Sequence, residues 1–170
     1  MLIRTALEDD AGRLLEIYSY YVEKTAISFE YDVPDIEEFR GRIQNTLKRY
    51  PYLVLEDDGK IQGYTYAGVF NDRASYDRSC EVTIYVDKDS KRKGYGRLLY
   101  EALEDALKNT EITNLYACIG DPEEEDEYLT KDSERFHRRL GYTTVGVFHR
   151  CGYKFDRWYN MIWMEKILRN

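Results

Sequence analysis

The sequence predicts an α/β protein in which helices flank one mixed β-sheet. Three observations carry this prediction: the chain has 170 residues, 43% of them are hydrophobic, and strand-like runs alternate along it with helix-like runs. This length suits one domain with a sizeable single core. The chain has only three prolines and no Gly/Ser linker, which argues against disorder. We therefore expect residues 1–170 to form a single domain.

The N-terminal half predicts two helices framed by strands. Residues 1–6 form a short apolar run, and residues 7–24 begin with acidic side chains and then space their apolar side chains as a helix does. A second helix is expected within residues 33–50, where Pro34 and acidic residues mark its start. Residues 52–70 predict a hairpin around Asp57, Asp58 and Gly59.

The C-terminal half predicts four further strands and two helices. The alternating, β-branched run that ends at Val86 favours a strand, and the leucines after Gly94 have the spacing of a helix with one buried face. The remaining elements are a strand at 112–120, a helix at 131–141 that ends at Gly141, and two strands within 142–168. The predicted order is therefore β-α-α-β-β-β-α-β-α-β-β.

Charge and cysteine content exclude several classes of function. A formal net charge of −7 makes the protein a poor nucleic-acid binder, because phosphate affinity needs a basic surface. No apolar run is long enough to cross a bilayer, and the N-terminus lacks a secretory signal, so we expect no membrane partner. Cys80, Cys118 and Cys151 are odd in number and far apart, which favours neither a disulfide framework nor a metal site. A reducing cytoplasm is the expected setting.

The stretch "KRKGYG" combines a local basic cluster with Gly94 and Gly96 where a strand turns into a helix. Such a turn exposes free backbone N–H groups at the positive end of the helix dipole, and glycines let a ligand approach the backbone. Phosphate is the expected ligand. The stretch lacks the GxxxxGK[ST] and GxGxxG patterns, so a simple helix cap is the alternative.

With the element order, this stretch resembles the pyrophosphate loop of the Gcn5-related N-acetyltransferase (GNAT) superfamily, over essentially the whole chain. The stretches "SERFHRRLGY" and "GYKFDRWYNMIWM" resemble the phosphinothricin acetyltransferase branch. The resemblance implies a single N-acetyltransferase domain that uses acetyl-CoA to acetylate the amino group of a small amino-acid-like acceptor. It also implies a homodimer.

The resemblance assigns cofactor contacts to the fourth predicted strand, the glycine loop and the 131–141 helix. Main-chain groups around Tyr85 and Val86 would hold the thioester and the pantetheine chain, and Ser133 matches a cofactor-contacting position. Where the branch has an Asn near Ser133, this chain has Thr130, Lys131 and Asp132 instead. Lys91 and Arg92 would add charge near the phosphates. The amides expected to bind the pyrophosphate are those of Lys93, Gly94, Tyr95, Gly96, Arg97 and Leu98.

Two residues are expected to move protons. A protonated amine cannot attack a thioester, so a carboxylate must take its proton, and Glu81 in "CEVTIYV" matches the branch's catalytic Glu. The alternative for Glu81 is a carboxylate at a strand edge. His137 matches a position whose side chain acts as an acid or a proton relay for the departing CoA thiolate. The alternative for His137 is a half-buried structural His. His149 matches no motif and is expected to be structural.

The resemblance also places Phe29, Arg73 and Tyr76 at the acceptor site. Arg73 is suited to a carboxylate through a forked pair of hydrogen bonds, although an exposed loop Arg is an equal alternative. The segment with Lys154 and Trp158 would close the acceptor side, with Trp158 expected in the core rather than in contact. The acidic residues 121–132 are either a solvated loop or part of the cleft entrance.

Two other kinds of function stay open. One is an acetyltransferase for a polyamine, an aminoglycoside or a protein N-terminus, because the net negative charge suits a cationic acceptor. The other is an acyl-CoA-binding sensor without catalysis, against which the presence of both Glu81 and His137 counts.

Overall fold

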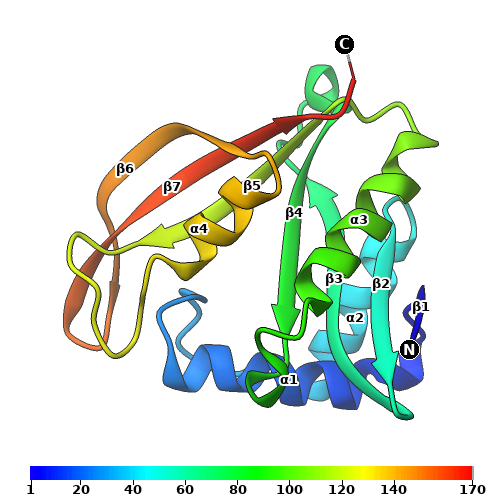
Figure 1. Cartoon of the computed structure of the whole chain (residues 1–170), viewed down its shortest axis with the longest axis horizontal. Helices are drawn as coiled ribbons and strands as arrows, with labels where there is room; N and C mark the ends of the chain where they lie inside the picture. Colours follow the sequence, from blue (N-terminus) through cyan, green and yellow to red (C-terminus); the bar gives the residue numbers. More distant parts are fainter. Residues whose placement is uncertain (170) are drawn as a thin grey trace.

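One mixed sheet of seven strands runs through the protein in the order β1-β2-β3-β4-β5-β7-β6 (Figure 1). We analysed a computed structural model that describes residues 1–169. β4 and β5 pair in parallel, and all other neighbouring strands pair antiparallel. The strands are β1 (Leu2–Thr5), β2 (Tyr52–Asp57), β3 (Lys60–Val69), β4 (Ser79–Val86), β5 (Asn114–Asp121), β6 (Thr143–Lys154) and β7 (Arg157–Ile167).

Helices cover both faces of this sheet (Figure 1). Apolar residues of α1 and α2 pack on the β2–β3 side of one face, and α3 packs on the opposite face. The helices are α1 (Ala11–Lys24), α2 (Ile36–Leu47), α3 (Tyr95–Lys108) and α4 (Asp132–Arg139), with short 3₁₀ turns at Glu8–Asp10, Ala74–Tyr76 and Lys88–Ser90. The predicted α/β class and the predicted order of strands and helices are confirmed.

Local sequence explains the element boundaries. The side chain of Asp35 accepts a hydrogen bond from the Glu38 amide at 2.8 Å and so caps α2. Asp58 and Gly59 both have positive φ in the β2–β3 turn, as the predicted hairpin requires. The β6–β7 turn places Phe155 and Asp156 at positive φ without any glycine.

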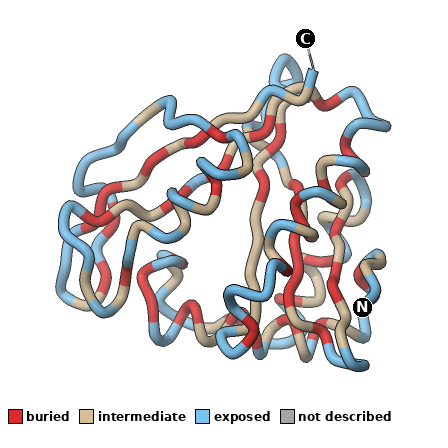
Figure 2. The backbone as a smooth tube through the Cα atoms, in the orientation of Figure 1, coloured by how far each residue is buried: buried red, intermediate tan, exposed pale blue. Residues whose placement is uncertain are grey.

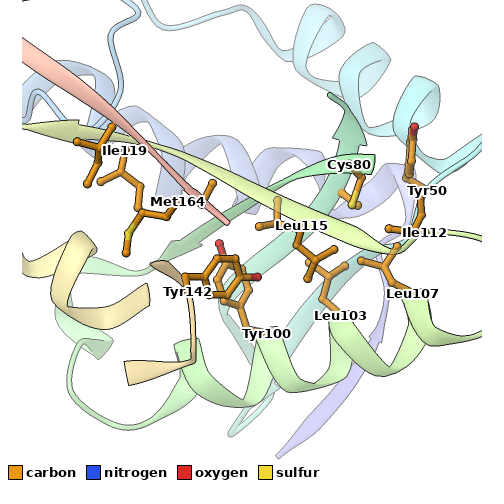
Figure 3. Packing of buried hydrophobic residues seen from close by; sticks show 14 residues of the cluster. Tyr50, Cys80, Tyr100, Leu103, Leu107, Ile112, Leu115, Ile119, Tyr142 and Met164 are labelled. Carbon is orange, nitrogen blue, oxygen red and sulfur yellow. The ribbon is translucent and has the colours of Figure 1, made fainter. Parts of the chain in front are cut away.

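The main core lies between α3 and the sheet. Leu103 and Leu107 lie there beside Leu115, Met164 lies toward Ile119, and the rings of Tyr100 and Tyr142 lie between these two groups (Figure 3). In contrast, most of the edge strand β6 is exposed (Figure 2). None of the helices within residues 1–169 is both long and apolar enough to span a membrane.

β4 and β5 separate soon after they begin. Their paired residues are limited to Ser79–Glu81 on β4 and Asn114–Tyr116 on β5. Beyond this short seam β4 stays with β3, β5 stays with β7, and the two strands diverge (Figure 1). The separation opens the sheet next to Glu81.

Candidate active site

A cavity of about 240 Å³ occupies the space between the separated strands. One wall is the β4 segment 81–85, the opposite wall is the β5 segment 117–120, and Ile27 and Leu129 contribute from loops. Ser133, His137 and Tyr100 line it from the helices. The cavity therefore gathers four of the residues that the sequence nominated from two separate elements: Glu81 and Tyr85 from β4, and Ser133 and His137 from α4.

The backbone of β4 has a free edge in this cavity. The Asp87 amide donates to the Gln62 carbonyl on β3, and the Arg78 carbonyl accepts from Thr113 and Asn114 at the start of β5. Because peptide groups alternate in direction along a strand, odd-numbered residues of β4 bond to β3 and even-numbered residues face β5. Past Glu81 no strand pairs with that edge, so peptide groups of Ile84 and Val86 face the cleft.

This alternation changes the expected role of Tyr85. Its peptide groups are directed at β3, where it lies opposite Tyr64, so Tyr85 offers its side chain rather than its main chain to the cavity. The Val86 carbonyl already accepts a hydrogen bond from the Tyr21 hydroxyl. The groups left for an extended amide chain are those of Ile84 and the Val86 N–H.

The N-terminus of α3 supplies donors for an anion. Gly94 is the N-cap with φ of +84°, and the first hydrogen bond of the helix runs from the Leu98 amide to the Gly94 carbonyl at 3.2 Å. The Leu98 amide, expected to bind pyrophosphate, is therefore used inside the helix. The N–H groups of Tyr95, Gly96 and Arg97 precede this bond and have no intrahelical partner.

The two loop glycines serve different purposes. Gly94 needs its positive φ, and a Cβ added there would meet nothing within 4 Å. At Gly96 an added Cβ would lie 3.1 Å from the ring of Phe136 on α4. The absence of a side chain at Gly96 thus lets α3 and α4 pack closely, and the approach of a ligand to its backbone stays a prediction.

The basic side chains of the loop are partly occupied by protein groups. Arg97 pairs with Glu101 at 2.6 Å. The Lys91 ammonium lies 5.6 Å and 5.4 Å from the ring centres of Tyr20 and Tyr21, within cation–π range, and Lys93 lies over the Tyr95 ring. The loop is therefore fastened to α1 through Lys91.

Glu81 lies at the closed end of the cavity, on the last paired position of β4. Its carboxylate has no hydrogen-bond or ion-pair partner within residues 1–169. Burial alone raises the pKa of this carboxyl above its ordinary value. An unpaired, partly buried carboxylate with a raised pKa in a cleft has the properties of a general base.

His137 is 4% exposed, and both of its ring nitrogens are engaged. Nδ1 lies 2.7 Å from the Ser133 carbonyl oxygen, which can only accept, so Nδ1 carries the proton. Nε2 lies 2.9 Å from the Tyr100 hydroxyl and accepts a hydrogen bond from it. Burial lowers the pKa of His137 to about 4, against a smaller raising effect of the Ser133 carbonyl. At neutral pH this imidazole is uncharged.

The three expected acceptor residues lie outside the cavity lining. Phe29 packs over Gly120 and Gly152, and Arg73 is an exposed loop residue without an ion-pair partner among residues 1–169. Tyr76 packs edge-on against Phe70. Phe70 in turn stacks on Tyr116 with ring centres 4.3 Å apart, and Tyr116 is the register partner of Glu81. The loop with Arg73 and Tyr76 is thus tied to the sheet beside Glu81.

The C-terminal hairpin differs from expectation at Trp158. This residue is 53% exposed rather than in the core, because it shares the sheet surface with Tyr153 (ring centres 4.8 Å apart) and with Arg150 at 5.5 Å from its ring centre. Lys154, by contrast, is 4% exposed. A lysine with this degree of burial is not visible in the sequence.

The acidic segment is held by hydrogen bonds to its own backbone and to β7, and one of its residues lines the cavity. The Asp126 carboxylate accepts from the amides of Tyr128 and Leu129 at 2.8 Å each and from the Tyr159 hydroxyl. Leu129 reaches the cavity lining. Thr130 and Lys131, which stand near the position where the branch has an Asn, bond locally to the Asp132 amide and to Asp121.

Sequence reasoning missed Tyr100, Ile27, Leu129 and Cys118, which also line the cavity. Tyr100 had one available signal, because a buried Tyr on the apolar face of a helix needs a partner for its hydroxyl. Cys80, Cys118 and Cys151 are free thiols.

The fold and this cavity define a class of enzyme. Free donors at a helix N-terminus, an unpaired strand edge and an unpaired carboxylate are placed to bind a phosphate-bearing carrier of an acyl group and to deprotonate a nucleophile. A family model described as the acetyltransferase (GNAT) domain matches residues 3–163. The chain belongs to the GNAT family and is an N-acetyltransferase.

Named relatives agree with this assignment over nearly the full length. The chain is similar to phosphinothricin N-acetyltransferase of Streptomyces coelicolor, at 32% identity over 98% of this chain and 95% of that one. The chain is also similar to the solved structure of the YncA acetyltransferase of Salmonella typhimurium with acetyl-CoA. The two structures align with a TM-score of 0.91 and 27% sequence identity, over 100% of this chain and 95% of that one. The solved ribosomal-protein-alanine N-acetyltransferase of Brucella melitensis aligns with this structure with a TM-score of 0.90 and 30% sequence identity, over 98% of this chain and 99% of that one.

Proposed function

We propose that this enzyme transfers the acetyl group of acetyl-CoA to the α-amino group of a small amino-acid-like acceptor. The observation that carries the proposal is Glu81, an unpaired carboxylate with a raised pKa at the closed end of the cavity. The similarity to a phosphinothricin N-acetyltransferase supports the choice of acceptor. Residues 1–170 act as one N-acetyltransferase domain in this proposal.

The residues present fit acetyl-CoA. The N–H groups of Tyr95, Gly96 and Arg97 would receive the pyrophosphate, with Lys93 and Gly94 shaping the turn before them. Ile84 and Val86 would hydrogen-bond the pantetheine chain, and Ser133 and Tyr85 would line it. When bound, acetyl-CoA supplies an activated acyl carbon near Glu81.

Glu81 then acts as the base. Its carboxylate takes a proton from the acceptor's ammonium group, directly or through water, and the freed nitrogen lone pair can form the new C–N bond while the C–S bond breaks. The attacking nitrogen then loses its second proton, and the departing thiolate takes up one proton, directly from this nitrogen or through Glu81 and water. His137 would assist this last transfer by holding the Tyr100 hydroxyl, which donates to its Nε2.

Arg73 and Tyr76 would hold the acceptor's carboxylate from the loop before β4, and Phe29 would support the opposite side. Apart from Tyr and Cys side chains, the ionisable residues of the cavity lining are Glu81 and His137. A cation that pairs with the acceptor's carboxylate therefore has to come from outside the lining. Arg73 lies in the loop that Phe70 ties to the Glu81 end of β4.

Paired acceptors test this function. Phosphinothricin and methionine sulfoximine are compared with their decarboxylated amines in an assay of CoA release. We expect the acids to have kcat/KM higher by 100-fold or more, the order expected when a charged site is left unpaired by the poorer substrate. Arg73→Ala should raise KM for the acids and leave simple amines nearly unchanged, with Arg40→Ala as control, because Arg40 lies on α2 and pairs with Glu37.

A protein N-terminus is the second candidate acceptor, because the Brucella relative is named for ribosomal-protein alanine. A short peptide with an N-terminal alanine belongs in the same panel. If this peptide, spermidine or an aminoglycoside has the highest kcat/KM, the amino-acid proposal is wrong. If no amine releases CoA although acetyl-CoA binds, the protein is a sensor.

We infer that two copies of the chain pair through β6. We also infer that the protein works in a reducing, cytoplasmic setting. β6 is an edge strand that exposes Val145, Val147 and Phe148 by 52%, 43% and 52%, and apolar edges of this kind pair readily. The free thiols Cys118 and Cys151 suit a reducing compartment. Sedimentation of wild type and of Phe148→Glu should show a dimer and a monomer; a wild-type monomer contradicts the inference.

A further inference from the structure

The loop between α1 and α2, residues 25–35, forms one side of the cavity through Ile27. The start of this loop is held by two hydrogen bonds: Thr25 Oγ1 accepts from the Ile27 amide at 3.1 Å, and the Ala26 amide donates to the Tyr128 carbonyl at 3.0 Å. The part that follows Ile27 is held by α1 and α2, where Tyr18 bonds to Ser28 and Arg42 pairs with Glu30, and also by the β6–β7 hairpin. No described residue of β6 or β7 itself lines the cavity.

Lys154 makes the first contact of the hairpin with this loop. Its ammonium donates to the carbonyls of Val22 and Ser28, both at 2.7 Å, and the side chain is 4% exposed. Val22 lies in the last turn of α1, where carbonyls lack helical partners and a cation is favoured by the dipole. One buried side chain therefore joins the end of α1 to the residue after Ile27.

Phe29 makes the second contact. Its ring lies over two glycines on different strands, Gly120 on β5 and Gly152 on β6, and within 6.5 Å (ring centres) of Tyr159 on β7. A Cβ at Gly152 would lie 2.6 Å from Phe29 Cζ, and one at Gly120 would lie 3.5 Å from Phe29 Cε1. The ring thus fills a slot that exists because Gly152 has no side chain.

We propose that Lys154 and Gly152 are positioning residues of the acceptor site: they hold Ser28 and Phe29, and through them Ile27, against the cavity without touching the acceptor. The proposal rests on the proposed function. The hairpin contacts Ser28 through Lys154 and Phe29 through Gly152. The C-terminal strands therefore set the shape of an acceptor wall that belongs to the N-terminal half of the chain.

Two glycine variants on β6 give a matched comparison. Gly152→Ala must displace the Phe29 ring, whereas Gly146→Ala meets nothing within 4 Å. With the preferred acceptor from the panel above, we expect Gly152→Ala to raise the acceptor KM about tenfold, with kcat and the acetyl-CoA Kd within about twofold of wild type. Gly146→Ala should match wild type in all three quantities.

Lys154→Met tests the other contact, with Lys166→Met as control because Lys166 pairs with Glu104 on α3 instead. Lys154→Met leaves the Val22 and Ser28 carbonyls without their donor. We expect the same rise in acceptor KM, and about tenfold faster hydrogen exchange of the amides in residues 27–31, for Lys154→Met but not for Lys166→Met.

Hydrogen exchange separates this proposal from the proposed function, because it needs no turnover. Faster exchange of residues 27–31 in Gly152→Ala and Lys154→Met supports the positioning role even if the acceptor is not an amino acid. Folded variants with wild-type exchange in this loop and wild-type acceptor KM would overturn it. A fall in kcat alone, at unchanged acceptor KM, would overturn it as well.

Discussion

The carbonyl oxygen of Ser133 lies 2.7 Å from Nδ1 of His137, one turn later on α4. This contact fixes the proton on Nδ1 and leaves Nε2 to accept from the Tyr100 hydroxyl at 2.9 Å. The imidazole thus has no proton to give directly to a ligand in the cavity. Any part that His137 plays in proton transfer has to pass through Tyr100.

A double-mutant cycle tests this route. Tyr100→Phe and His137→Gln should each lower kcat at least about tenfold, and the double variant should be no slower than the slower single variant, because the two groups act as a unit. Tyr142→Phe is the control, since the Tyr142 hydroxyl is buried without a partner among the described residues. If the kcat of the double variant falls by the product of the two single-variant factors, Tyr100 and His137 act independently.

The stability of the fold should depend on His137 below neutral pH. Its pKa is about 4 in the folded protein against an ordinary value of 6.5, so the unfolded chain binds more protons between these values. The contribution to the free energy of unfolding is complete above pH 6.5 and is lost as the pH falls toward 4, by about 3 kcal/mol. Denaturant unfolding of wild type and His137→Gln from pH 7 to pH 4 measures it. Parallel curves for the two proteins would contradict the buried, neutral state.

The pH profile of catalysis should report on Glu81. Burial raises the pKa of this carboxyl, and a base works only when deprotonated, so kcat/KM should fall as the pH drops through that raised value. Glu81→Gln should lower kcat about 100-fold and remove this limb of the profile. Both proteins are assayed with the same acceptor, so the ionisation of the acceptor's amino group affects both pH profiles equally. A variant that keeps wild-type turnover would leave Glu81 as a strand-edge carboxylate.

The contact between Gly96 and Phe136 predicts an effect on packing. Gly96→Ala brings a Cβ to 3.1 Å from the Phe136 ring and should lower the free energy of unfolding by about 1–3 kcal/mol, the usual cost of overpacking. Phe136→Leu in the same chain should recover most of the loss. Gly41→Ala in α2, where an added Cβ meets nothing within 4 Å, should instead stabilise the protein by about 0.5–1 kcal/mol. An unchanged free energy of unfolding in Gly96→Ala would show that α4 moves away without cost.

Local periodicity was sufficient to predict the strands, the helices and their order, because each pattern lies within a few consecutive residues. Glu81, Ser133 and His137 could be nominated from motifs, and the structure places them in one cavity. The direction of the Tyr85 peptide groups could not be predicted, since it depends on the register with β3. The burial of Lys154 and the exposure of Trp158 depend on which strand packs against α1, and that is set by contacts more than 100 residues apart in the chain.

The short seam between β4 and β5 places Glu81 where two arms of the sheet meet. β1–β4 belong to one arm and β5–β7 to the other, and the arms are joined within the sheet only over three residue pairs, the last of which is Glu81 with Tyr116. The arms are tied a second time outside the sheet, where Lys154 of β6 donates to the carbonyls of Val22 and Ser28. A cleft bounded by these two ties resists both widening and narrowing, so we expect the size of the acyl group that fits beside Glu81 to be limited.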